Sequence, residues 1–167
     1  MHMHTLVSGH AYGTIREMVI EAKQQGLQLI GISEHAPGIP GTVDPFYYCN
    51  LEIIPAKIEG IEVLHGCEIN VLNGGKLSLE QQYIDYAIVG IHRQCYQDEG
   101  REVNTDNLIE CMKNDKVFFV SHPDDDHTPL NYSRLVQAAK KYHVALEVSN
   151  SSLVKEKYRL NCYHNYK

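Results

Sequence analysis

The stretch Leu29-Ile30-Gly31-Ile32-Ser33-Glu34-His35 is a short apolar run that ends in a histidine. Three later stretches have a similar form, namely Ile61-Glu62-Val63-Leu64-His65-Gly66-Cys67-Glu68, Ala87-Ile88-Val89-Gly90-Ile91-His92 and Val117-Phe118-Phe119-Val120-Ser121-His122. Near-continuous apolar runs are typical of parallel strands that are covered on both faces. The C-terminal ends of parallel strands meet at one face of a barrel, so we expect the residues that end these runs to converge there.

Helical patterns alternate with these runs, which indicates a repeat of strand and helix. The expected strands are Leu27–Ser33, Glu62–Asn70, Ala87–His92, Val117–Ser121 and Val144–Val148. The expected helices are Thr14–Gln25 with Gly26 as a stop, a short one within Leu51–Glu59, Leu79–Tyr83, Asn107–Lys113 with Asp106 as N-cap, and Ser133–Tyr142 with Leu135, Val136 and Ala139 inward. Intervals of 33, 24, 30 and 25 residues separate the strand ends from His35 to Glu147, and they fit successive βα units. The sequence therefore predicts an α/β fold, a (β/α) barrel or a piece of one.

Length and composition limit the remaining choices. A chain of 167 residues with 43% hydrophobic content suffices for a single domain, here expected over 1–167. The net charge of −6 argues against a nucleic-acid or membrane surface, and no apolar stretch reaches the roughly 20 residues that span a bilayer. The five cysteines are scattered and form no C-x-x-C pair, so we expect reduced thiols and a cytoplasmic location.

Seven residues have the chemistry of metal ligands: His2, His4, His10, His35, Glu68, His92 and His122. Imidazole is the commonest protein ligand of zinc, and carboxylates complete or bridge such sites. His2 and His4 point to one side of an extended segment, because side chains alternate along a strand. Taken singly, each of the seven is better explained as an ordinary polar residue of a surface or strand end. Their coincidence at successive strand ends favours a metal site.

Several motifs together resemble the PHP family (polymerase and histidinol phosphatase), in particular its stand-alone phosphatases with a trinuclear metal centre. The early ones are His2-Met3-His4-Thr5 and Ser8-Gly9-His10-Ala11-Tyr12-Gly13-Thr14. The later ones, similar in order and spacing, are Ser33-Glu34-His35, Gly66-Cys67-Glu68-Ile69-Asn70, Gly90-Ile91-His92 and Ser121-His122-Pro123.

The resemblance implies a distorted seven-stranded (β/α) barrel that binds up to three divalent metals. Zinc is the expected metal, and manganese or iron is also compatible with the ligands. It implies that His2 and His4 bind one metal, and that Glu68 bridges this metal to a second one held by His92 and His122. His10 and His35 would bind the third. The residues expected to act in catalysis are Glu68, His92, His122 and Arg93; for Arg93 an ordinary surface arginine is an equal alternative.

The chain also departs from the family pattern. The family's final Asp-x-His motif does not follow Ser152, and only Met1 precedes the first histidine pair. We therefore expect an incomplete barrel that lacks the last strand and most of the first. Such a seam would expose unpaired strand edges and favour self-association. His164 has no assigned role.

Three functions remain open. The first is a metal-dependent phosphatase that hydrolyses small phosphate monoesters through a metal-activated water, with histidinol, sugar and nucleotide phosphates all compatible as substrates. The second is a catalytically impaired metal-binding fragment or pseudoenzyme. The third is an amidohydrolase-like C–N hydrolase, which ranks lowest because no lysine ends an expected strand.

Overall fold

The computed structural model describes residues 1–80, 82–149 and 152, and these divide into two compact units. The first unit comprises Met1–Ile69 and Ser78–Ile88, and the second comprises Asn70–Leu77 and the chain from Val89. The described residues do not include Cys162 or His164. They also do not include the segment after Ser152, on which the expectation of a missing last strand rests.

The first unit is built on parallel strands. Its elements are η1 (Leu6–Ser8), α1 (Ile15–Gln24), β1 (Leu29–His35), α2 (Phe46–Cys49), η2 (Leu51–Ile53), β2 (Lys57–Ile58), β3 (Ile61–Leu72) and β5 (Tyr86–Gly90), and both β3 and β5 continue into the second unit. The strand order is β1-β3-β5, and β2 pairs antiparallel with β3. The parallel register of β1 and β3 places His35 opposite Glu68, so the two strands end at the same level.

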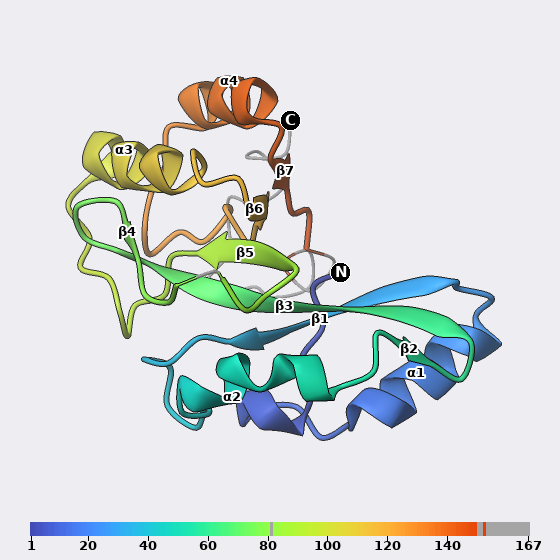
Figure 1. The fold of residues 1–167 in the computed structure, drawn as a ribbon. Coiled ribbons are helices and arrows are strands. Elements are labelled where there is room, and N and C mark those ends of the chain that lie inside the picture. The colour runs from blue at the N-terminus through green and yellow to red at the C-terminus, as the bar shows by residue number, and fades with distance from the viewer. Residues whose placement is uncertain (81, 150–151, 153–167) are drawn as a thin grey trace. The chain divides into compact units, whose positions relative to one another are not determined.

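Helix α1 covers one face of β1 and β3 (Figure 1). It begins at a capping box, in which the Thr14 hydroxyl accepts from the Glu17 amide and the Glu17 carboxylate accepts from the Thr14 amide. Val19 and Ala22 are buried against Ile30 of β1, in a core cluster that also includes Ile32, Ile61 and Val63. The 3.6-residue period of apolar side chains thus predicted this helix well.

The N-terminal residues lie along β1. The amide of Ser33 donates to the Met3 carbonyl at 2.8 Å, and the hydroxyl of Tyr86 donates to the Met1 carbonyl at 2.5 Å. The Tyr86 ring lies so close to Gly66 that a Cβ there would come within 2.5 Å of it. Met3 packs on the core cluster. Because side chains alternate along extended chain, His2 and His4 face away from that core.

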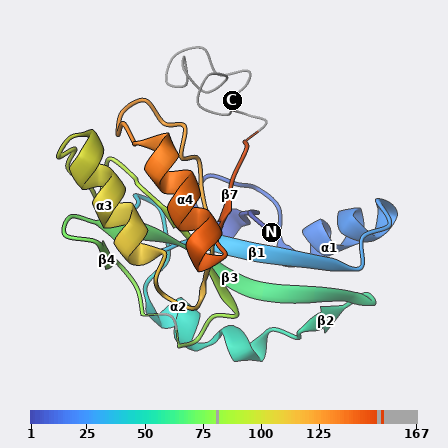
Figure 2. The same ribbon diagram turned by 90° about the horizontal axis from the view of Figure 1, so that it is seen from above.

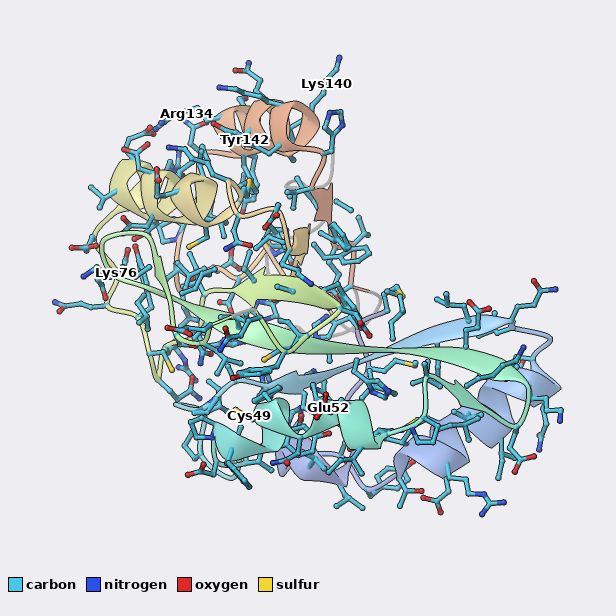
Figure 3. All side chains as sticks on the ribbon, in the orientation of Figure 1. Cys49, Glu52, Lys76, Arg134, Lys140 and Tyr142 are labelled. Carbon is cyan, nitrogen blue, oxygen red and sulfur yellow. The ribbon has the colours of Figure 1, made fainter. Side chains whose placement is uncertain are left out.

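The second unit repeats the strand–helix alternation. Its further elements are β4 (Lys76–Leu77), α3 (Arg101–Cys111), β6 (Val117–Val120), α4 (Tyr132–Tyr142) and β7 (Ala145–Leu146). The strand order is β5-β6-β7, with β6 and β7 parallel, and α3 and α4 lie side by side (Figure 2). Arg134 of α4 (Figure 3) forms ion pairs with Glu102, at 2.7 Å, and with Asp106, both on α3.

The α/β class with parallel strands is confirmed, but several element predictions were wrong. The short helix expected within Leu51–Glu59 is present as η2, but it is preceded by α2, which was not predicted and in which the Tyr48 side chain is buried. The described residues of the expected helix Leu79–Tyr83 form none. Val136 is 56% exposed rather than inward, whereas Leu135 and Ala139 are buried as predicted.

Helix α3 begins at Arg101, six residues before the expected start, and Asp106 lies inside it rather than at its N-cap. Its first turns carry buried polar side chains, so the sequence shows no amphipathic pattern there. Asn104 is fully buried, accepts from the Tyr96 hydroxyl at 3.0 Å and donates to Asp98 at 2.7 Å. Specific hydrogen bonds, rather than apolar periodicity, hold this end of the helix.

Within the described residues, no helix has both the length and the apolar content to cross a membrane. Among the described residues, Cys49, Cys67, Cys95 and Cys111 are not in disulfides.

His65 on β3 is buried, only 8% exposed. Burial lowers the pKa of its imidazole, an effect partly opposed by the Asp85 carboxylate and by the hydrogen bond to the Pro55 carbonyl. Within the described part of the chain, its Nε2 makes no hydrogen bond. Protonation would therefore place a charge where the structure offers it little solvation.

The buried His65 predicts a loss of stability in mild acid. Because its pKa is lowered in the folded state, the unfolded chain binds more protons near and below about pH 6.5, so this contribution is present above that pH and lost as the pH falls. We expect wild-type protein to lose more unfolding free energy between about pH 7.5 and about pH 5.5 than His65→Asn, measured by urea unfolding in the presence of EDTA. Equal losses in the two proteins would contradict this.

Candidate metal centre

Three ligand atoms converge in the first unit. The Nε2 atoms of His2 and His4 lie 3.1 Å apart, and each lies 3.3 Å from Oε2 of Glu68. The histidines come from the segment paired with β1, and Glu68 comes from the adjacent strand β3. These three residues could hold a metal ion.

The spacing of this triangle fits a tetrahedral ion. Ligand atoms at ~2.0–2.1 Å from a tetrahedral zinc lie about 3.3 Å from one another. The observed separations of 3.1, 3.3 and 3.3 Å match one face of such a tetrahedron. Three protein ligands with a fourth position left for water or substrate are the arrangement of catalytic rather than structural zinc sites.

A second group with ligand chemistry shares His4. His4, His10 and His35 form a set of imidazoles whose ligand atoms could also hold a metal. The rings of His4 and His35 are stacked with centroids 4.5 Å apart, and the His10 ring lies 4.9 Å from each of them. Nδ1 of His10 contacts the Ser8 carbonyl oxygen at 3.1 Å. A carbonyl only accepts, so Nδ1 of His10 carries the proton and its Nε2 keeps a lone pair for a metal.

Glu68 is the electrostatic centre of this region. Its side chain is 1% exposed, and besides His2 and His4 it meets Nδ1 of His35 at 2.9 Å. A buried carboxylate surrounded by three imidazoles needs compensating positive charge, whether from protons on the rings or from a metal ion. The donor set of imidazole nitrogens and one carboxylate suits zinc, manganese and iron.

Sequence reasoning missed the residues that support these ligands. Glu34 is 1% exposed and accepts from the amide and hydroxyl of Thr5 and from the hydroxyl of Ser8. The Ser8 hydroxyl also lies 3.0 Å from Nδ1 of His4 and accepts from the His35 amide at 3.0 Å. Their only signal in the sequence was their place inside motifs that carry ligand histidines.

In the second unit, His92 and His122 face each other. Their Nε2 atoms are 3.1 Å apart, and their rings meet edge to face with centroids at 4.9 Å. Nδ1 of His92 lies 2.8 Å from Oδ1 of Asn70, which is fully buried. An amide oxygen only accepts, so Nδ1 of His92 carries the proton and its Nε2 lone pair is directed toward His122.

The backbone of this pair is tightly constrained. His122 has a φ of 32°, an uncommon value for a residue with a side chain, and its amide donates to Oε2 of Glu147 at 2.7 Å. A charge-assisted bond of this kind stabilises the uncommon backbone conformation. A Cβ at Gly90 would lie 2.3 Å from Oγ of Ser121, 3.0 Å from Cε1 of His92 and 3.2 Å from Cε1 of His122. The close approach of these side chains therefore favours a glycine at this position.

Arg93, Cys67 and Tyr48 adjoin the ligand motifs or contact them. Arg93 is exposed, and its catalytic role stays a prediction. Burial raises the pKa of the Cys67 thiol, so the thiolate needed by a nucleophile is disfavoured. Burial likewise raises the pKa of Tyr48, which keeps its hydroxyl proton and donates to the carbonyls of Glu34 and His35 at 3.1 and 2.7 Å.

The close approach at Gly90 gives a stability prediction. Gly90→Ala should lower the unfolding free energy by about 1–3 kcal/mol, because Ser121 and both imidazoles must move. Gly13→Ala is the matched control, since its new methyl meets only the flexible end of Met18. Urea unfolding of the metal-free proteins provides the comparison. Equal midpoints for the two variants would show that the second-unit pair is loosely packed.

The comparisons with known proteins agree with one another. Residues 1–150 match the model of the PHP domain. A probable phosphatase of Caldanaerobacter subterraneus subsp. tengcongensis is 40% identical over 92% of this chain and 62% of its own length. One from Caldicellulosiruptor saccharolyticus is 37% identical over 96% of this chain and 70% of its own. The chain spans 62–64% of the length of the first three relatives compared.

A solved structure shows the same fold. Histidinol phosphate phosphatase from Lactococcus lactis subsp. lactis, complexed with zinc, L-histidinol and phosphate, superposes with a TM-score of 0.57 at 15% identity, over 99% of this chain and 79% of that one. The fold is therefore of the PHP type, a (β/α) barrel-like arrangement with parallel strands. With the domain match and these relatives, the chain belongs to the PHP family.

Proposed function

We propose that this chain is a metal-dependent phosphoesterase acting on small phosphate monoesters. The observation that carries the proposal is the triangle of His2, His4 and Glu68, whose ligand atoms are spaced as around one tetrahedral ion. The names of the relatives, probable phosphatases, support the same activity.

In this proposal His2, His4 and Glu68 hold one metal, and His10 and His35 contribute to another beside it. The facing pair of His92 and His122 supplies ligands in the second unit. That Glu68 also bridges to the metal of this pair, as the family resemblance implies, stays a prediction.

When bound, divalent metals neutralise the charge of a phosphate dianion and lower the pKa of water toward neutrality. The chain's own residues orient and balance that chemistry. Glu68 provides a buried carboxylate that attracts cations into the site. The Ser8 carbonyl accepts from Nδ1 of His10, which leaves Nε2 as the ring atom that can bind a metal. Arg93, an exposed cation, is proposed to contact phosphate oxygens.

A covalent phospho-enzyme is not required. Cys67 is fully buried with a raised pKa, and the Ser8 hydroxyl is committed to Glu34. Direct attack by water is consistent with both observations.

The test compares two glutamates of the same strand. Glu68→Ala removes the buried carboxylate, and Glu62→Ala removes an exposed one near the start of β3, where it lies opposite Leu29 of β1. Metals per protomer are counted by native mass spectrometry, and phosphatase activity is measured on p-nitrophenyl phosphate with added zinc or manganese. We expect Glu68→Ala to lose metal and roughly 100-fold or more of the activity, and Glu62→Ala to match wild type.

The outcomes separate the functions that the sequence left open. Unchanged turnover in Glu68→Ala would sink the proposed mechanism. Metal bound to wild type without hydrolysis of any phosphate ester would identify the catalytically impaired alternative. Hydrolysis of an amide panel in preference to the ester would favour the C–N hydrolase.

A further inference from the structure

We propose that Glu34 is a positioning residue that acts through Ser8 to keep the proton of His4 on Nδ1. Nε2 of His4 is then always the atom presented to a metal. The inference deepens the proposed function, because it rests on His4 being a ligand, but its first test does not require metal.

The argument begins with the hydrogen bonds of Glu34. The backbone amide of Thr5 lies 3.2 and 3.1 Å from the two carboxylate oxygens and can only donate. The Thr5 hydroxyl lies 2.5 Å from Oε1, and the Ser8 hydroxyl lies 2.5 Å from Oε2. An ionised carboxylate accepts at both oxygens and donates nothing, so this ring of donors matches it.

Counting protons on Ser8 gives the next step. A serine hydroxyl has one proton to donate, and the short contact to Oε2 of Glu34 takes it. The Ser8 oxygen can then only accept from its other neighbours. One is the His35 amide, at 3.0 Å, which is a donor in any case. The other is Nδ1 of His4, at 3.0 Å. For that contact to be a hydrogen bond, Nδ1 of His4 must carry the proton.

The tautomer of His4 follows from this count. With the proton on Nδ1, the lone pair of the neutral ring is on Nε2, which faces His2 at 3.1 Å and Glu68 at 3.3 Å. A hydroxyl alone would not make this choice, because it can donate to one tautomer or accept from the other. Glu34 removes the ambiguity. Partners of this kind orient metal-binding histidines and raise their basicity.

A variant of Thr5 can distinguish a positioning role of Glu34 from a merely structural one. Its hydroxyl binds the other oxygen of the same carboxylate and is as buried as that of Ser8, at 1% exposure for both residues. It makes no hydrogen bond to His4 among the described residues. Ser8→Ala and Thr5→Val therefore remove equivalent bonds to Glu34, and only Ser8→Ala removes the link to the ring.

The first experiment reads the tautomer in the metal-free protein. Nitrogen-15 NMR of the histidine side chains distinguishes a protonated Nδ1 from an unprotonated one. We expect Nδ1 of His4 to be protonated in wild type and in Thr5→Val, and the preference to be lost in Ser8→Ala. A protonated Nδ1 in Ser8→Ala, at the wild-type fraction, would overturn the inference.

The second experiment measures zinc affinity by competition with a chromophoric chelator. Ser8→Ala should bind zinc about 10–100-fold more weakly than wild type, while Thr5→Val stays close to it. Equal losses in the two variants would show that Glu34 only holds the loop and would overturn the positioning role. A wild-type chain without zinc would instead refute the proposed function, and the NMR result would still decide the tautomer.

Glu34→Gln covers the case in which Ser8→Ala does not fold. The amide is close in size to the carboxylate but has one accepting oxygen and one donating nitrogen, so it cannot accept from all of these donors. We expect the protonated fraction of Nδ1 of His4 and the zinc affinity both to fall. Wild-type values for both would contradict the proposal.

Discussion

The first unit depends on the buried carboxylate of Glu68, which lies among its histidines. Glu68 has three imidazoles within 3.3 Å and almost no access to water. A carboxylate in this position is costly unless positive charge accompanies it, so the histidines and any cation they bind are part of what allows the strand ends to pack. The parallel register that sets His35 opposite Glu68 is thus an electrostatic as well as a topological feature.

Much of this arrangement could be predicted from the sequence, because its main signal is local. Apolar runs that end in His35, Glu68, His92 and His122 indicate parallel strands, and parallel strands end at one level. The alternation of an extended chain likewise predicts that His2 and His4 point the same way. The least successful predictions concern segments whose structure is set by tertiary contacts, such as α2, which depends on the buried Tyr48.

The supporting residues were beyond prediction for a similar physical reason. Ser8, Glu34 and Asn70 carry no periodic pattern, and their roles arise only when the chain brings them to a particular nitrogen. Glu147 was recognised as the end of a strand, but not as the acceptor for the His122 amide. Ligands recur at strand ends, whereas the groups that orient them come from several different elements of the chain.

Ser8 touches three of the first unit's histidines at once, through its hydroxyl to His4 and to the His35 amide and through its carbonyl to His10. Local opening of η1 would release these contacts together, so the imidazoles are coupled as a single cooperative unit rather than as independent side chains. A substitution at Ser8 would therefore have to keep the contacts to all three histidines at once.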